Sequence, residues 1–75
     1  MRKIRVLIKP KEGLLDPQGR AVEEMLKERG VELKNLKVGK LVEFEVDSSR
    51  EDIRSIVERY IINPLIEEYE IEEMR

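Results

Sequence analysis

The tetrapeptide Asp16-Pro17-Gln18-Gly19 is the most specific arrangement of polar residues in this chain of 75 residues. An aspartate side chain accepts hydrogen bonds from the free backbone N–H groups at a helix start, and a proline suits the first helical turn. These roles explain Asp16 and Pro17 but not the two residues after them. Because glycine costs about 1 kcal/mol relative to alanine inside a helix, Gly19 indicates that the backbone must be bare there. Gln18 adds an amide that both donates and accepts hydrogen bonds.

The chemistry of an independent enzyme is missing from the rest of the sequence. The chain has no histidine and no cysteine, which removes the usual general base, thiol nucleophile and zinc ligands. The serines at 48 and 49 are better read as helix caps, and the lone Gly39-Lys40 pair is not a phosphate-binding loop. We therefore expect no catalytic, cofactor-binding or metal-binding residues. Gln18 and Gly19 become candidates for a contact between subunits.

Two other short motifs are candidates for the same kind of contact. Gly39 is most simply a turn glycine with positive φ, and Lys40 is either solvated or an anchor for a partner's carboxylate. Asn63-Pro64 is first a helix stop and second an exposed, rigid contact surface. The full set of expected subunit-contact residues is Asp16, Pro17, Gln18, Gly19, Gly39, Lys40, Asn63 and Pro64.

Length and charge narrow the class of protein. We expect a single domain over residues 1–75, too small to bury a large core and without disulfides, so that oligomerisation would add burial. Fifteen basic and 17 acidic residues give a net charge of −2, which favours neither nucleic acid nor an anionic membrane as a partner. No apolar run reaches the ~18 residues of a membrane span, so a cytoplasmic protein is expected. The 43% charged residues, with very few asparagines and glutamines, suggest a thermophilic source.

The two ends of the chain carry opposite charge. The first segment is basic and the last is acidic, as their charged residues show: Arg2, Lys3, Arg5, Lys9 and Lys11 against Glu67, Glu68, Glu70, Glu72 and Glu73. The simplest interpretation is that two strands lie side by side with complementary charges.

Hydrophobic spacing predicts the first half of the fold. Alternation over residues 4–8 predicts a strand, and a loop follows over residues 10–15. Apolar residues at helical spacing predict a helix from Asp16 to about Arg29, with Gly30 as a left-handed cap.

The middle of the chain predicts a hairpin. Residues 36–38 and 42–46 alternate between apolar and charged, and a three-residue loop at 39–41 places all their apolar residues on one face. This register also sets Lys37 opposite Glu43 on the outer face.

A second helix and a last strand complete the order. Ser48 and Ser49 are the predicted caps of the second helix, and Pro64 ends this helix near Ile62. Its apolar stripe consists of Ile53, Ile56, Val57, Tyr60 and Ile61. Residues 68–72 alternate as a final strand. The order βαββαβ predicts an α+β, ferredoxin-like antiparallel sheet with two helices on one face.

These motifs, taken in order, resemble one known family. A basic first strand leads into Leu15-Asp16-Pro17-Gln18-Gly19, then Gly39-Lys40 follows, then Asn63-Pro64 and the run from Ile66 to Ile71. The chain resembles PurS, the small subunit of phosphoribosylformylglycinamidine synthase, over nearly its whole length. Each motif alone is weakly specific, whereas three of them in order in so short a chain are fairly specific.

The resemblance implies a function that composition does not. Such a subunit is not catalytic alone; it joins a glutaminase subunit (PurQ) to a synthetase subunit (PurL) and helps ammonia pass between them in purine (IMP) biosynthesis. It implies a homodimer or tetramer, with ATP, Mg and glutamine used by the complex and no cofactor bound by this chain. The alternative is a ferredoxin-like regulatory module that dimerises and senses a small molecule. An RNA-binding domain of the same order is disfavoured because the chain has only three aromatic residues and an acidic balance.

Overall fold

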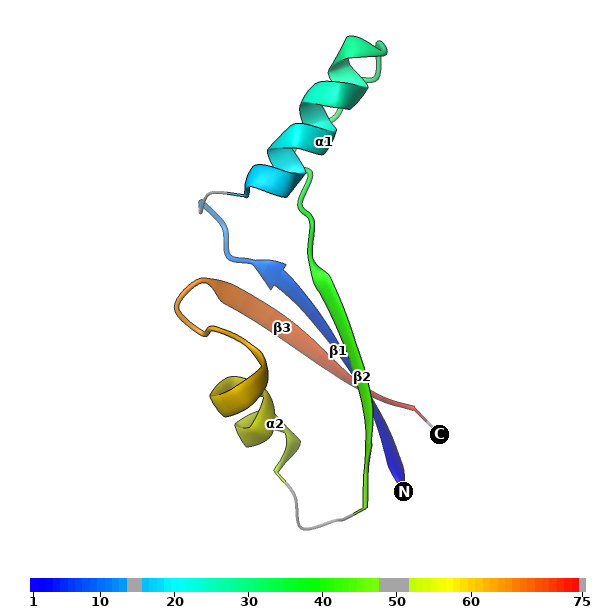
Figure 1. The fold of residues 1–75 in the computed structure, drawn as a ribbon, viewed down its shortest axis with the longest axis vertical. Helices are drawn as coiled ribbons and strands as arrows, with labels where there is room; N and C mark the ends of the chain where they lie inside the picture. Colours follow the sequence, from blue (N-terminus) through cyan, green and yellow to red (C-terminus); the bar gives the residue numbers. More distant parts are fainter. Residues whose placement is uncertain (14–15, 48–51, 75) are drawn as a thin grey trace.

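The computed structural model describes residues 1–13, 16–47 and 52–74. Within these residues a three-stranded antiparallel sheet has the order β2-β1-β3 (Figure 1). The elements in chain order are β1 (Arg2–Pro10), α1 (Pro17–Glu28), β2 (Lys40–Val46), α2 (Ile53–Ile56), the π-helical turn η1 (Val57–Ile61) and β3 (Glu67–Met74). The predicted α+β class, with an antiparallel sheet and two helices, is confirmed.

One face of the sheet carries the core. Ile4, Val6 and Ile8 alternate along β1 and are buried, as the period of a strand requires. Ile53 and Val57, from α2 and η1, are the other buried apolar residues of this core. The second helix is therefore held by apolar burial against the central strand.

The basic and acidic ends of the chain do lie side by side, as predicted. β1 pairs with β3 in antiparallel register, with Arg5 opposite Glu72 and Lys9 opposite Glu68. Lys9 Nζ lies 3.5 Å from Glu68 Oε1, and Arg5 reaches Glu43 of β2 at 3.1 Å as well as Glu72 at 3.9 Å. Because these pairs are exposed, they specify which strands align more than they add to stability.

The predicted hairpin over residues 36–46 is wrong. β2 pairs with β1, with Phe44 opposite Ile4 and Val42 opposite Val6, and residues 36–38 belong to no strand. The backbone N–H of Val38 donates to Asp16 Oδ2 at 3.1 Å, so a side chain rather than a neighbouring strand takes that hydrogen bond. Lys37 accordingly pairs with Glu12 at 2.5 Å and not with Glu43.

Helix α1 does not lie on the sheet of its own chain. It starts beyond the end of β1 and extends away from the sheet, and residues 31–38 return alongside it (Figure 1). The expectation that both helices cover one face is therefore corrected: within the described residues only α2 and η1 do. We call residues 17–38 the arm. Gly30 has φ +85°, which confirms the left-handed cap, and the helix ends at Glu28, one residue before the predicted Arg29.

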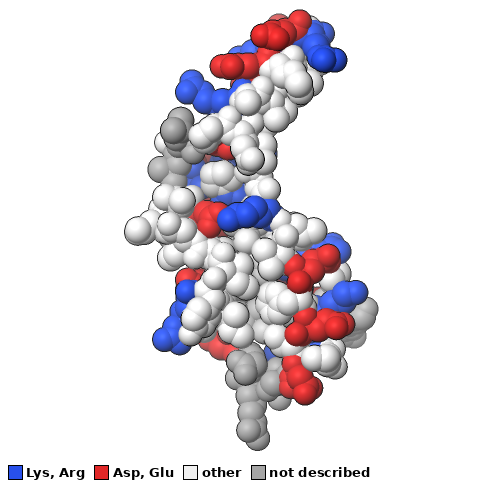
Figure 2. Space-filling view, viewed as in Figure 1, with Lys and Arg blue, Asp and Glu red and all other residues white. Residues whose placement is uncertain are grey.

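No apolar side chain of the arm is fully buried, although five are half-buried: Val22, Leu26, Leu33, Leu36 and Val38. Gly19 is the one buried residue of α1, and Met25 remains 47% exposed. Figure 2 shows uncharged surface running along one side of the arm, with charged residues at its tip and on its left side. An isolated helix of this length is marginal in water, so its apolar stripe needs a covering surface.

A π-helical turn changes the second helix. The N–H of Ile62 donates to Val57 O at 3.0 Å, five residues back, which widens the turn by one residue. Ile61 and Ile62 both pack against the core as a result, whereas Tyr60 is 77% exposed. The prediction that Tyr60 belongs to the buried stripe is wrong, because the stripe assumed regular α-helical spacing.

The start of the second helix is capped by Asp52, whose Oδ1 accepts the N–H of Ser55 at 3.4 Å. The predicted caps, Ser48 and Ser49, lie outside the described residues.

A side-chain network fastens this helix to β3. Arg54 Nη1 donates to the Tyr69 hydroxyl at 2.8 Å, and that hydroxyl donates to Glu58 Oε1 at 2.6 Å. The hydrogen bond to the Glu58 carboxylate is the main reason that the pKa of Tyr69 lies above its usual value.

Candidate functional site

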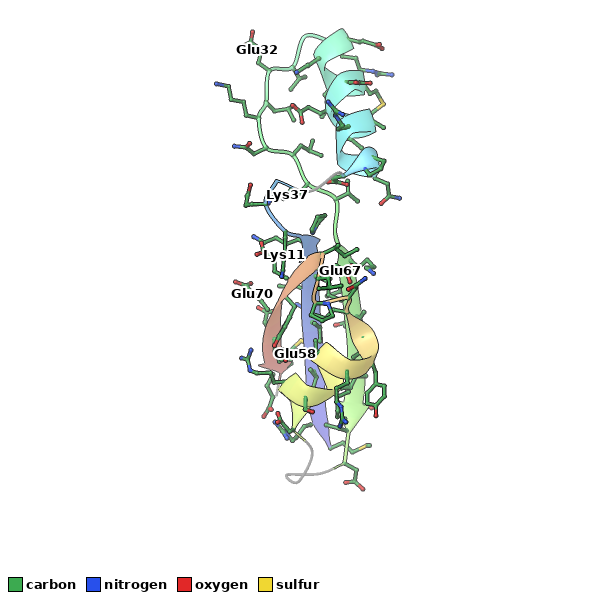
Figure 3. The ribbon with its side chains drawn as sticks, turned by 90° about the vertical axis from the view of Figure 1, so that its left-hand side faces the viewer. Lys11, Glu32, Lys37, Glu58, Glu67 and Glu70 are labelled. Carbon is green, nitrogen blue, oxygen red and sulfur yellow. The ribbon has the colours of Figure 1, made fainter. Side chains whose placement is uncertain are left out.

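All the candidate contact residues lie at one end of the sheet. β1 ends there at Pro10, whereas β2 and β3 begin there at Lys40 and Glu67, because both run antiparallel to β1. We call this region, with residues 16–19 and 63–66, the motif end. Three motifs far apart in sequence therefore come together: Asp16, Gln18, Gly39 and Lys40 line one hollow with Glu67, to which Asn63 is hydrogen-bonded. Figure 3 shows Lys37, Lys11 and Glu67 near the base of the arm.

Asp16 accepts two backbone hydrogen bonds from different parts of the chain. Its Oδ1 accepts the N–H of Gly19 at 3.0 Å, which is the predicted helix cap. Its Oδ2 accepts the N–H of Val38 at 3.1 Å, at the end of the returning segment. The second bond was not predicted, because nothing in the sequence shows that residues 36–38 pass the start of α1.

Gly19 is explained by packing within the chain. It is buried, and a Cβ placed on it would overlap the Asp16 carboxylate and lie 2.9 Å from Leu36 O. Glycine is thus needed so that the returning segment can approach the helix start. Pro17 occupies the first helical position, as predicted.

Gln18 is exposed, as is Pro17 before it. It lines a shallow hollow of about 310 Å³ together with Lys40 and Glu67. Of the four motif residues, Pro17 and Gln18 are therefore the two whose side chains are open to another molecule.

Gly39 serves close approach rather than a turn. Its φ is not positive, which corrects the prediction of a left-handed turn glycine. A Cβ there would overlap the carbonyl oxygen of Ile8 on β1. The glycine lets β2 begin against β1 where a side chain would hold the strands apart.

Lys40 links the two outer strands. Its Nζ lies 3.0 Å from Glu67 Oε2, so the pair crosses β1 from β2 to β3. Its side chain is 61% exposed, which agrees with the solvated alternative, and it also forms an ion pair with Glu67 in the same chain. Contact with a partner remains a prediction.

Asn63 organises the turn before β3. Its carbonyl oxygen accepts the N–H groups of Ile66 at 3.1 Å and Glu67 at 2.8 Å, and its Oδ1 accepts that of Leu65 at 3.1 Å. With Pro64 fixing φ, the turn is rigid, and it presents Leu65 at 82% exposure. The predicted pairing of a helix stop with an exposed rigid loop describes this geometry.

Glu67 is the residue that sequence reasoning missed at this end. Its Oε1 accepts the N–H of Asn63 at 2.7 Å while Oε2 meets Lys40. The hydrogen bond from Asn63 is the main reason that the pKa of the Glu67 carboxyl is lowered, and Lys40 lowers it further against the opposing effect of burial. A carboxylate four residues after Asn63 was the available signal.

A second ionic contact lies at the base of the arm. Lys37 donates to Glu12 Oε1 at 2.5 Å, and this hydrogen bond is the main reason that the pKa of Glu12 is lowered. The base of the arm is thus tied to the loop after β1 by Glu12 and to the helix start by Asp16.

The polar side chains of the motif end bind other parts of the same chain and include no reactive group. Its carboxylates are held by backbone N–H groups and lysines, an arrangement that fixes geometry and presents surface. In the described residues, no three acidic side chains are grouped to hold a metal ion. No helix described is long and apolar enough to cross a membrane.

Comparison with known proteins identifies the family. The family model described as PurS, phosphoribosylformylglycinamidine (FGAM) synthase, matches residues 3–75. The PurS subunit of Bacillus subtilis is 33% identical, over 99% of this chain and 96% of that protein. A crystal structure of B. subtilis PurS aligns with a TM-score of 0.86 at 31% identity, covering both chains fully.

A structure of PurLQS from Thermotoga maritima contains a similar chain. It aligns with a TM-score of 0.79 at 26% identity and covers 99% of each chain. The match over nearly all residues, by both sequence and fold, shows that this chain belongs to the PurS family of phosphoribosylformylglycinamidine synthase.

Proposed function

We propose that this chain bridges the glutaminase (PurQ) and synthetase (PurL) subunits of phosphoribosylformylglycinamidine synthase and assists ammonia transfer in IMP biosynthesis. The family match supports the identity of the enzyme, and the T. maritima PurLQS structure supports the choice of partner subunits. ATP, Mg and glutamine are then used by the other subunits, with no cofactor on this chain. The reaction takes place in the cytoplasm.

The arm is the observation that carries this proposal. Residues 17–38 extend beyond the sheet with no apolar side chain buried. A surface of this kind gains stability when another molecule covers it, because apolar burial then offsets more of the conformational entropy lost on ordering it. We propose that a second copy covers it, as a dimer or a tetramer, and that the larger subunits meet the motif end.

Reconstitution tests the bridging role. Synthetase activity is measured with glutamine and, separately, with free ammonia, in the presence and absence of this chain. The proposal expects glutamine-dependent activity to require the chain, and ammonia-dependent activity to require it much less. Undiminished glutamine-dependent activity without the chain would contradict the proposal.

A binding measurement supplies the second check. The chain and both larger subunits are passed through a sizing column with glutamine and ADP present. Co-elution of all three is the expected result. Separate elution at micromolar concentration would argue against a bridging subunit.

A further inference from the structure

We propose that Asp16 is a positioning residue whose carboxylate fixes the direction in which the arm leaves the sheet. Assembly then depends on that direction more than on contact by Asp16 itself. The statement about direction concerns a single chain, whereas the statement about assembly rests on the proposed function.

The two carboxylate oxygens hold two chain segments at once. Oδ1 accepts from Gly19 in the outgoing helix, and Oδ2 accepts from Val38 in the returning segment. Both oxygens belong to one planar group, so the two segments are fixed relative to each other as well as to Asp16. An ordinary helix cap uses one oxygen and leaves the returning segment free.

Two glycines make this clamp sterically possible. Gly19 has no Cβ where one would overlap the Asp16 carboxylate, and Gly39, next to Val38, has none where one would overlap Ile8 O. The bare backbone on both sides lets helix, returning segment and sheet meet around one carboxylate. The glycine that the sequence left unexplained is thus part of the clamp.

The base of the arm decides its direction because the arm lacks other supports. In the described residues the only other side-chain ion pair or hydrogen bond between the arm and the loop after β1 is the Glu12–Lys37 pair, whose glutamate side chain is 84% exposed. An exposed ion pair is screened and contributes little. Asp16 is half-buried, so its two hydrogen bonds hold the arm more firmly.

The chain offers a matched control in Asp52. It caps α2 through Oδ1 and the N–H of Ser55, and among the described residues it accepts no hydrogen bond from a second segment. Substitutions at Asp52 thus remove a cap without releasing an arm. Gln18, exposed in the same motif, is the control for direct contact.

Hydrogen exchange of the Gly19 and Val38 amides, measured by NMR in the full chain, tests whether Asp16 holds both segments. In Asp16→Asn the side chain keeps one acceptor oxygen, so it can hold Gly19 or Val38 but not both. We expect one of these amides to lose protection at least tenfold while the other keeps it, and Asp52→Asn to change neither. Equal protection of both amides in Asp16→Asn would overturn the proposal, as would loss of protection throughout β1.

A distance measurement reads the direction of the arm. The chain has no cysteine, so Glu28→Cys on α1 and Glu45→Cys on β2 accept a donor and an acceptor dye without competing sites. At nanomolar concentration, single-molecule transfer should give one narrow distribution in the otherwise unchanged chain and a broad one after Asp16→Ser. Asp52→Ser should keep the narrow distribution. A narrow distribution after Asp16→Ser, or a broad one before it, would overturn the proposal.

Self-association, followed by sedimentation, separates direction from contact. We expect Asp16→Ser to weaken association about tenfold and Gln18→Ala to change it less than twofold. If Gln18→Ala weakens association as much as Asp16→Ser, the motif acts by contact and the assembly statement is wrong. Exchange and distance measurements involve no larger subunit, so failure of the bridging role would leave their result standing.

Discussion

The two helical regions of this chain begin alike and end up in opposite environments. Asp16 caps α1 and Asp52 caps α2, each through a carboxylate on the backbone N–H three residues later. Yet α2 and η1 bury Ile53 and Val57 against the sheet, whereas α1 buries no apolar side chain. One chain therefore contains one helix that is stabilised by its own core and another whose apolar side chains the chain itself does not fully bury.

Truncation of a buried side chain in the second helical region should lower the free energy of unfolding the most. Ile53→Ala leaves a cavity next to Val57 and should cost about 3 kcal/mol of unfolding free energy. Because this core lies within one chain, the loss should not depend on protein concentration. Urea denaturation at several concentrations measures it.

Leu26→Ala in the arm is the matching substitution. Its loss should appear mainly at concentrations where the chain is associated, since binding adds to apparent stability by mass action. Equal losses at all concentrations for both variants would remove the distinction between the two regions.

Gly39→Ala should have the next largest effect. Its Cβ would overlap the carbonyl oxygen of Ile8, so β1 and β2 must separate at the motif end, at a cost of about 2 kcal/mol. Gly13→Ala is a useful contrast, because that Cβ meets no atom and only its φ of +77° opposes it. Thermal unfolding compares the two, and a smaller loss at Gly39 would contradict the close-approach explanation.

Tyr69→Phe should cost about 1 kcal/mol, because it removes the hydroxyl that links Arg54 and Glu58. Tyr60→Phe is its control: Tyr60 is exposed on η1, so stability should change by less than about 0.5 kcal/mol. Equal effects would mean that the network does not hold the helix to β3.

The smallest effect should be a pH dependence from Glu67. Its folded pKa lies below the usual 4.5, so its stabilising contribution is complete above pH 4.5 and is lost as pH falls through the folded value. Glu67→Gln should flatten the stability profile in that acid range and change little near pH 7. Glu12, which is more exposed and lies in the loop after β1, should show a weaker dependence. A larger acid loss from Glu12 than from Glu67 would reverse the comparison.

Sequence reasoning succeeded where local pattern and global pairing agree. Alternation over Ile4, Val6 and Ile8 and the opposite charges of the terminal segments predicted β1 and its pairing with β3. It failed over residues 36–38, which alternate as a strand does. The backbone N–H of Val38 donates to the Asp16 carboxylate instead of to a neighbouring strand. It also failed at Tyr60, since a π-helical turn leaves no mark on apolar spacing.

The sequence pointed to the three motifs of the motif end but not to how they are organised there, and their contact with other subunits stays a prediction. Their convergence follows from antiparallel order once β1 is placed between β2 and β3. The roles of Gly19 and Gly39 depend on distances between backbones that no local pattern contains. Glu67 was absent from the list because its partners, Asn63 and Lys40, are brought to it by the fold.

The central position of β1 has a consequence for how the protein is made. Arg5 has neighbours at Glu43 and Glu72, so the first strand synthesised is completed only by the last. Contacts across such a span of sequence slow folding, since loop closure must precede them. A nascent chain on the ribosome should therefore keep Ile4, Val6 and Ile8 exposed until α2, η1 and β3 have all emerged, a period in which chaperone binding would protect it.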